Sequence, residues 1–416
     1  MLRLPTENTL DREENIMAEW ITTTLEECTD ILGDGLHGTP KYTENGEYAF
    51  VNGNNLVDGE ILIKKETKRV DYSQYDKYKK PLTNRTILVS INGTLGNVGV
   101  YGSEKIILGK SACYFNVKES VDKDFIYYIV SSPTFKQYLE SNATGTTIKN
   151  ISLKQMREYT FELPEIGEQK RISSILRKID EKIKNNRAIN NNLLEQLNQL
   201  YTEFSTRSDW SEMSIGDVAV KVAMGPFGSN IKVSTFVEYG VPIISGNHLR
   251  GYFLEEPSYN YITEEHAEKL KNSIVYPKDI IFTHAGNIGQ VAMIPDGCEF
   301  PYYVLSQRQF YLRCNTEQVV PEYVLLFFHS KKGQHELLSY ANQTGVPSIA
   351  QPATNLKKIR LPIPSLDKQK DWLSVVTPLI TMYQNNYQAT KRLASLRDTL
   401  LPKLMSGGIN VSNLDL

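Results

Sequence analysis

Apolar positions with helical spacing run through two separate parts of the chain. In residues 166–205, apolar side chains recur at alternating steps of three and four residues. They are Ile172, Leu176, Ile179, Ile183, Leu193, Leu197, Leu200 and Phe204, with Asn186 and Asn190 at the two remaining seam positions. This spacing predicts a coiled-coil seam. A helix of roughly 37 residues is about 55 Å long, so we expect it to pair with another helix. The alternative is packing on the core of its own domain.

The same seam returns when 200 is added to each residue number. Its positions are Trp372, Val376, Leu379, Tyr383, Asn386, Thr390, Leu393, Arg397, Leu400 and Leu404. The polar position Asn186 is repeated as Asn386, and a buried polar layer fixes the register of a helix pair at a cost in stability. Pro378 lies inside this second pattern and predicts a kink or a later helix start.

The remaining segments, 17–163 and 207–363, have a different character. They are rich in Gly, Asn, Tyr and Thr and contain short β-branched runs such as 86–91 and 279–282. These runs predict short strands joined by turns, with one helix near 125–142 and another near 321–341. The fold class predicted is therefore α+β, with two β-rich domains that are each followed by a long helix.

Five sequence pairs recur in the same order, which indicates an internal duplication. They are Trp20/Trp210, 52–56/245–249, Gly96–Gly99/Gly286–Gly289, Thr144-Gly145/Thr344-Gly345 and 163–170/363–370. We therefore expect two diverged copies of about 200 residues. The predicted organisation is an N-terminal extension (1–16), a domain (17–163), a helix (164–206), a second domain (207–363) and a second helix with a tail (364–416).

Composition and charge limit the possible functions. The chain is 40% hydrophobic and 23% charged, which is typical of a soluble protein. We find no apolar run long enough for a membrane span. The four cysteines are scattered, which favours reduced thiols in the cytoplasm over disulfides or a zinc site. The net charge of -2 argues against a free-standing nucleic-acid binder, so DNA contact would need local basic groups or partner subunits.

Motifs for catalysis are absent from the sequence. It contains neither an Asn/Asp-Pro-Pro-aromatic base clamp, nor a phosphate-binding loop ending in Gly-Lys-Ser/Thr, nor a His-Glu-x-x-His zinc motif. The spacing of Gly93, Gly96 and Gly99 superficially suggests a dinucleotide loop, but strand-like runs flank it. We interpret it as a tight turn that requires positive φ. We expect no catalytic residue and no metal site, and a chain that recognises rather than reacts.

From Met17 onward the chain resembles the specificity subunits of type I restriction-modification systems. The resemblance rests on the repeated junctions Leu163–Lys170 and Ile363–Lys370, on the helix end Leu400–Gly407, and on the turn Gly93–Gly99. Residues 1–16 depart from the family pattern. The resemblance implies two target recognition domains, each reading one half of a split, asymmetric site in double-stranded DNA, and two helices that pair antiparallel as a spacer.

The resemblance also implies partners and cofactors. It predicts a complex with two methyltransferase subunits and with restriction/translocase subunits, in which the methyl donor, ATP and Mg²⁺ are bound by the partners and none by this chain. We expect the partners to dock on the helices, with Leu401 and Met405 off the seam and available to them. One rival interpretation is a self-contained restriction-methylation enzyme, which the missing catalytic motifs disfavour. Another is a scaffold protein whose β domains bind protein rather than DNA.

Candidate DNA-reading residues are polar side chains in predicted turns, since Asn and Gln read adenine and Arg and Lys read guanine. They are Lys41, Asn54, Asn55, Asn92, Thr94 and Lys110 in the first copy, and Asn230, Lys232, Asn247, His248, Arg250, His284, Asn287, Gln307 and Arg308 in the second. The alternative for each is a solvated turn residue or a strand-end hydrogen bond. Gln307 and Arg308 are favoured because they lie between two strand-like runs.

Overall fold

The computed structural model describes residues 20–145, 147–206, 210–256, 258–342 and 345–411. The predicted extension 1–16, the start of the predicted domain 17–163, and Thr344 lie outside these ranges. The chain forms two compact units, which we call the first unit (1–185 with 389–416) and the second unit (186–388). Each unit takes one half of each long helix, so the sequence-based borders between domains and helices stay a prediction.

The first unit is built on a four-stranded antiparallel sheet with the order β2-β10-β7-β8. A second sheet, β6-β3-β9, joins β3 and β9 in parallel, and β1 pairs with β11. Its strands are β1 (Ile21–Thr24), β2 (Thr29–Asp34), β3 (Tyr48–Val51), β4 (Leu56–Val57), β5 (Glu60–Ile61), β6 (Arg69–Val70), β7 (Thr86–Ser90), β8 (Val98–Val100), β9 (Ile106–Leu108), β10 (Ala112–Val117) and β11 (Thr160–Leu163). Its short helices are η1 (Gly53–Asn55), α1 (Tyr72–Tyr78), α2 (Lys123–Ser131), α3 (Pro133–Asn142) and α4 (Leu153–Arg157).

The second unit repeats this plan. Its four-stranded antiparallel sheet has the order β13-β20-β17-β18, β14 and β19 are parallel neighbours in the next sheet, and β12 pairs with β23. Its strands are β12 (Ser211–Ser214), β13 (Ala219–Met224), β14 (Val241–Ile244), β15 (Asn260–Ile262), β16 (Ile274–Val275), β17 (Ile280–Thr283), β18 (Val291–Met293), β19 (Tyr303–Leu305), β20 (Gln309–Cys314), β21 (Ala341–Asn342), β22 (Ser348–Ile349) and β23 (Arg360–Ile363). Its short helices are η2 (Gly228–Asn230), η3 (Val233–Thr235), η4 (Gly246–His248), α6 (Glu264–Lys269), η5 (Lys271–Ser273), α7 (Pro321–His329), α8 (Lys331–Leu338) and α9 (Pro352–Lys358). The duplication is thus confirmed at the level of topology.

Each helix predicted near 125–142 and 321–341 is in fact a pair of shorter helices. Ser132 ends α2 and caps α3 by accepting a hydrogen bond from the Phe135 amide, and Pro133 opens α3. Ser330 separates α7 from α8 in the same way and accepts from the Gly333 amide. A serine cap stabilises a new helix start, and this local signal divides the apolar pattern in both copies.

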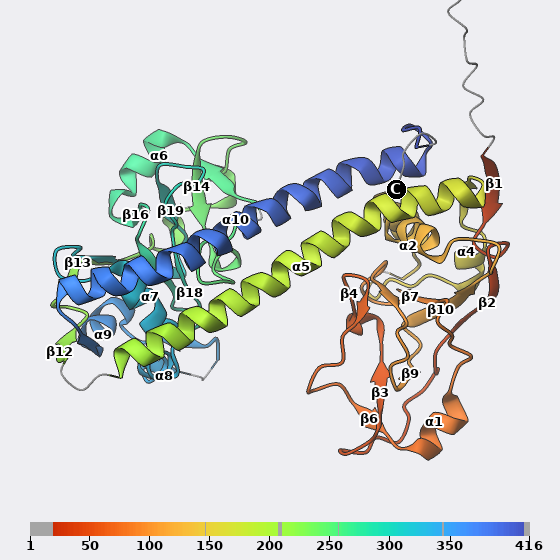
Figure 1. The fold of residues 1–416 in the computed structure, drawn as a ribbon, viewed down its shortest axis with the longest axis horizontal. Helices are drawn as coiled ribbons and strands as arrows, with labels where there is room; N and C mark the ends of the chain where they lie inside the picture. The colour runs from red at the N-terminus through yellow and green to blue at the C-terminus, as the bar shows by residue number, and fades with distance from the viewer. Residues whose placement is uncertain (1–19, 146, 207–209, 257, 343–344, 412–416) are drawn as a thin grey trace, which may run out of the picture. The chain divides into compact units, whose positions relative to one another are not determined.

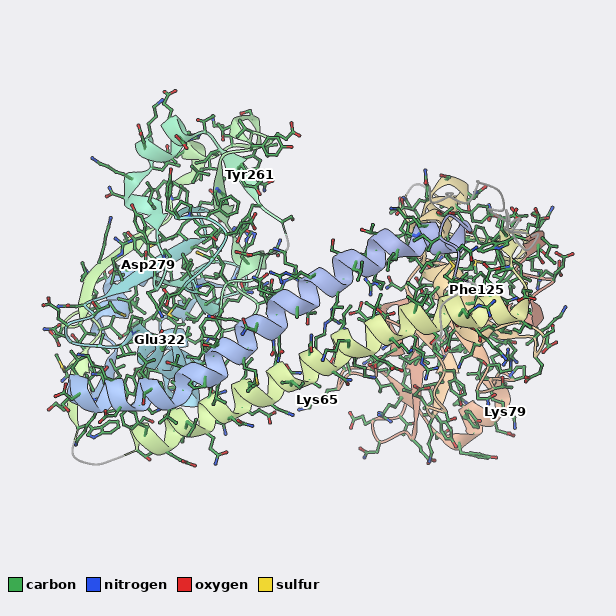
Figure 2. All side chains as sticks on the ribbon, turned by 45° about the horizontal axis from the view of Figure 1, so that its top comes forward. Lys65, Lys79, Phe125, Tyr261, Asp279 and Glu322 are labelled. Carbon is green, nitrogen blue, oxygen red and sulfur yellow. The ribbon has the colours of Figure 1, made fainter. Side chains whose placement is uncertain are left out.

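The long helices are α5 (Ile166–Ser205) and α10 (Leu366–Met405). In the first unit, the start of α5 lies beside α2 and α4, while α1 lies at the opposite end (Figure 1). The labelled side chains agree, since Phe125 of α2 lies next to α5 and Lys79, just after α1, lies far from it (Figure 2). Phe125 shares one apolar core with Ile172 and Leu176 of α5.

A buried glutamine joins the β-rich part of each unit to the long helix that follows it. The Gln169 side chain accepts from the Asp122 amide at 2.8 Å and donates to the Pro164 carbonyl at 2.7 Å. Gln369, which is fully buried, accepts from the Val320 amide and donates to the Pro364 carbonyl in the same arrangement. These contacts explain the repeated junction motif, because the glutamine saturates buried backbone groups at the start of α2 and α7.

The two helices pair antiparallel within the first unit. Leu401 and Leu404 of α10 join Ile172 and Leu176 of α5 in one core. One turn further along, Arg397 Nη1 lies 2.9 Å from Asp180 Oδ1, so the seam position predicted at Arg397 is confirmed as a helix contact. Leu401 is therefore a core residue and Leu400 only half-buried, and the prediction that Leu401 lies off the seam for partners is wrong.

The pairing continues antiparallel within the second unit. The rings of Phe204 and Trp372 stack with centroids 5.5 Å apart, and the Asn190 amide donates to the Tyr383 carbonyl at 3.1 Å. Of the predicted pairing residues, the buried ones are Ile172, Leu176, Ile183, Asn186, Leu193, Leu197, Val376 and Tyr383, and the half-buried ones are Ile179, Leu379, Asn386, Leu393 and Leu400. Ile380 is buried in place of Leu379. Pro378 does not delay the helix start, because α10 begins at Leu366 and Pro378 lies on its exposed side.

Candidate nucleic-acid interface

Loops meet at one edge of the four-stranded sheet of the first unit, where β2 and β7 end and β8 and β10 begin. We call this the loop edge. The turn after β7 has φ of +79° at Gly93 and +77° at Gly96, which glycine adopts without strain. The Gly93 amide donates to the Lys149 carbonyl at 2.9 Å and ties the turn to the segment before α4. The predicted positive-φ turn is confirmed.

The second unit has the same loop edge. Gly286 and Gly289 both have φ of +87°, and the Gly286 amide donates to the Pro347 carbonyl at 2.9 Å. Gly286 therefore corresponds to Gly93, and Gly289 to Gly96. The pairing of Gly96 with Gly286 that was made from the sequence is therefore wrong by three residues. Gly93, Gly96 and Gly99 follow one another at intervals of three residues, so the second copy can be aligned with either Gly93-x-x-Gly96 or Gly96-x-x-Gly99.

Two of the first-unit candidates come together at this edge. Asn92 and Lys110 line one hollow of about 500 Å³ with Asp34 and His37. Lys110 and His37 also line a neighbouring hollow of about 390 Å³. Lys110 is exposed at the tip of the turn between β9 and β10, whereas the Asn92 amide donates to Asn150 Oδ1 at 3.1 Å. The edge thus offers a cation and an amide in an open, concave surface.

The second-unit candidates His284, Gln307 and Arg308 also come together. Gln307 and Arg308 are exposed in the turn between β19 and β20, the position that Lys110 and Ser111 hold in the first unit. His284 Nε2 lies 3.2 Å from the Gln307 carbonyl. This turn therefore presents an amide and a guanidinium side by side, which is the chemistry that reads adenine and guanine.

Asn55 and His248 are structural residues, and their assignment as DNA readers is wrong. Both are at least 94% buried and close equivalent turns, η1 and η4. Asn55 Oδ1 accepts from the Asn52 amide at 3.0 Å and its amide donates to the Leu62 carbonyl. His248 Nδ1 accepts from the Ser245 amide at 3.0 Å, and Nε2 bonds the Ser258 carbonyl. The sequence located the two turns correctly. It did not show that the Asn55 and His248 side chains face the interior, and they were therefore mistaken for base-reading residues.

The other candidates are exposed and stay predictions. Thr94 and Asn287 lie in the turns after β7 and β17, and Asn54 and Asn247 lie in η1 and η4. Lys41 lies beside α1, where its backbone amide donates to Gln74. Asn230 and Lys232 lie in the segment after β13, and the Asn230 carbonyl bonds His266 Nε2 at 2.7 Å. Arg250 is exposed and follows η4, near Glu255, a carboxyl whose pKa is raised by burial.

One repeated element of the loop edge was missed in the sequence. The strand β2 is followed by Gly35-Leu36-His37-Gly38, and β13 is followed by Gly225-Pro226-Phe227-Gly228. Gly35 and Gly225 are as far apart in the sequence as Trp20 and Trp210. A comparison of the two sequence copies at this separation would therefore have revealed the element. Gly35 and Gly225 press against the neighbouring turn, where an added Cβ would collide with backbone atoms. His37 and Phe227 are presented to solvent at matching places.

The described histidines and cysteines do not form a reactive centre. No group of three or more His, Cys, Asp or Glu suited to a metal ion occurs among the described residues. Burial lowers the pKa of His329 to about 4, and its ring stacks on Tyr252, so this half-buried histidine is neutral at pH 7. Burial raises the pKa of the Cys113 thiol. In the described part of the chain, none of the helices is long and apolar enough to cross a membrane.

Two copies of one β-rich fold, each with exposed turns at one loop edge and each joined to an antiparallel helix pair, define a duplicated recognition protein. A profile of the type I restriction modification DNA specificity domain matches residues 17–195 and again residues 207–393. The chain therefore belongs to the family of type I restriction-modification specificity subunits. It is a DNA sequence-recognition subunit and not an enzyme.

Similar proteins cover nearly the whole chain. The MjaIX specificity subunit of Methanocaldococcus jannaschii is 23% identical over 409 residues, which are 90% of this chain and 87% of that protein. The EcoBI specificity subunit of Escherichia coli is 21% identical over 403 residues, with 85% and 81% covered. The crystal structure of a type I S subunit from M. genitalium has a TM-score of 0.57 at 20% identity and covers 94% of this chain and 98% of that one. That structure supports the duplicated fold.

Proposed function

We propose that this subunit reads a bipartite, asymmetric site in double-stranded DNA, with one loop edge for each half. The observation that carries this proposal is the difference between two matching edges. Lys110 of the first unit stands where the second unit has Gln307, and Asn92 stands where it has Ala285. Since Lys, Gln and Asn contact different base edges in the major groove, the two edges select different sequences. Family membership disfavours the scaffold interpretation.

The subunit works in a complex that supplies the chemistry. It associates with two methyltransferase subunits and with restriction/translocase subunits, and those partners bind the methyl donor, ATP and Mg²⁺. The net charge of -2 supports this division of labour, because phosphate contacts need a basic surface that the partners contribute. The exposed faces of α5 and α10 are the proposed docking surface, with Leu401 excluded because it is buried.

A binding experiment tests the proposal directly. The chain is mixed with labelled genomic fragments, alone and after assembly with its methyltransferase partners, and retained fragments are sequenced. We expect selective retention by the assembly of fragments that share a split site. Equal retention of all sequences, or retention that depends only on a protein partner's own DNA binding, would contradict the proposal.

The helix pair is proposed to fix the spacing between the half-sites. One heptad inserted into α5, with a matching heptad in α10, lengthens the pair by roughly 10 Å, or about three base pairs. We expect a longer spacer and unchanged half-sites when methylated positions are mapped. A change in the half-site sequences themselves would contradict this role.

A further inference from the structure

Phe227 differs from the other phenylalanines of this protein in its exposure to solvent. All 14 phenylalanines lie within the described residues, and only Phe227 is exposed, at 80% of its surface. A single exposed apolar side chain is ordinary in a soluble protein. The argument therefore rests on where the ring is held and on what occupies the matching place in the first unit.

The backbone around Phe227 is fixed, so the ring is presented rather than left loose. Gly225 and Pro226 are buried, and the Gly225 amide donates to the Gln309 carbonyl at 2.8 Å. The Phe227 carbonyl in turn accepts from the Asn230 amide at 3.0 Å. The same turn that Gly225 contacts carries Gln307 and Arg308. Phe227 is therefore anchored to the turn that carries the strongest candidates for base reading.

The matching residue of the first unit indicates which surface Phe227 belongs to. Its counterpart is His37, which lines both hollows of the loop edge together with Lys110. The position thus belongs to the candidate DNA surface in each unit, with a polar ring in one and an apolar ring in the other. A difference of this kind changes which chemical group of a base pair is favoured.

We propose that Phe227 reads a thymine through its 5-methyl group in the half-site bound by the second unit. This inference rests on the proposed function. Gln307 and Arg308 have hydrogen-bonding groups suited to base edges in the major groove, and the apolar group on that same surface is the thymine methyl. His37 is polar, so the first half-site has no equivalent methyl contact.

The test uses the subunit assembled with its methyltransferase partners and the duplex found by mapping methylated sites. Each thymine is replaced in turn by deoxyuridine, which removes only the methyl group, and Kd is measured by fluorescence anisotropy. For the wild type we expect about fourfold weaker binding at one position of the second-unit half-site, the effect of one buried methyl group. For Phe227→Ala we expect equal affinity for both duplexes.

Val220→Ala is the matched control, because Val220 is also exposed, at 65%, but lies at the other end of β13. It should keep the full deoxyuridine effect. A half-site without thymine, no sensitive position, or a position that stays sensitive in Phe227→Ala would overturn the inference. A wild-type assembly without sequence-selective binding would instead contradict the proposed function.

Discussion

The two loop edges share a backbone arrangement but carry different side chains. The matching positions, first unit before second, are His37/Phe227, Ile91/His284, Asn92/Ala285, Lys110/Gln307 and Ser111/Arg308. Glycines with positive φ and the same amide-to-carbonyl bonds hold both frames. The contrast extends to the short helices α1 and α6, since α1 has no acidic residue in its first turn while α6 begins with Glu264 and Glu265. One frame thus supports two chemically different surfaces, which is what an asymmetric site requires.

The largest expected effect comes from breaking the shared frame. Gly35→Ala and Gly225→Ala should each destabilise their unit by about 3 kcal/mol, because the new Cβ meets rigid backbone atoms of the adjacent turn. Gly38→Ala is the control, since open space surrounds its Cβ position. Urea unfolding of the three variants measures the difference. Equal stability of Gly35→Ala and Gly38→Ala would show that the close approach is not needed.

The glutamine at each helix junction is the next most sensitive point. Gln369→Ala leaves the Val320 amide and the Pro364 carbonyl buried without their partner, and we expect a loss of about 2–3 kcal/mol. Gln169→Ala should behave similarly in the first unit. Gln199→Ala, on the exposed side of α5, should change the free energy of unfolding by only about 0.5 kcal/mol. A loss in one unit but not in the other would show that the two junctions are not equivalent.

Acid should weaken the second unit more than the first. The pKa of His329 is lowered to about 4 by burial, so below its ordinary pKa near 6.5 the unfolded chain takes up a proton that the folded unit does not. Stability is therefore lost as pH falls, by about 2 kcal/mol between pH 7 and pH 5. The matching residue of α2 is Ser131, which does not titrate in this range.

Tryptophan fluorescence separates the units in this experiment. In a Trp20→Phe background the signal comes from Trp210 and Trp372, which both belong to the second unit. His329→Phe should flatten the pH dependence of the urea midpoint. An unchanged pH dependence in that variant would rule out His329 as its source.

The smallest expected effect is a change in selectivity at a single base pair, and it compares matching turns of the two loop edges. Arg308→Ala should relax one position of the second half-site by about 1–2 kcal/mol, as expected for an exposed guanine contact. Lys110→Ala, at the matching turn, should affect only the other half. Mapping methylated sites in cells carrying each variant measures both. Uniform weakening on every sequence would instead identify a phosphate contact, and a change in both half-sites would contradict the two-reader proposal.

Patterns that repeat over many residues were predicted well from the sequence. The helix seam and the repeated junction motif were found because apolar positions recur at every turn of a helix and the motif recurs in both copies, but the role of its glutamine came only from the structure. Local chemistry was harder to predict. Asn55 and His248 look like readers in a Gly-Asn-rich stretch, and only their hydrogen bonds show that they face inward. Phe227 was missed because base reading was sought only among polar residues, although its loop repeats at a regular separation.

The division of α10 between the units has a consequence for synthesis on the ribosome. The face of α5 that carries Ile172 and Leu176 is completed by Leu401 and Leu404, which are made only after all of residues 186–388. At roughly 5–20 residues per second, that delay is about 10–40 s. The second unit has all of its residues first, while the nascent first unit keeps an apolar strip open to chaperones, or to the same strip on a neighbouring nascent chain.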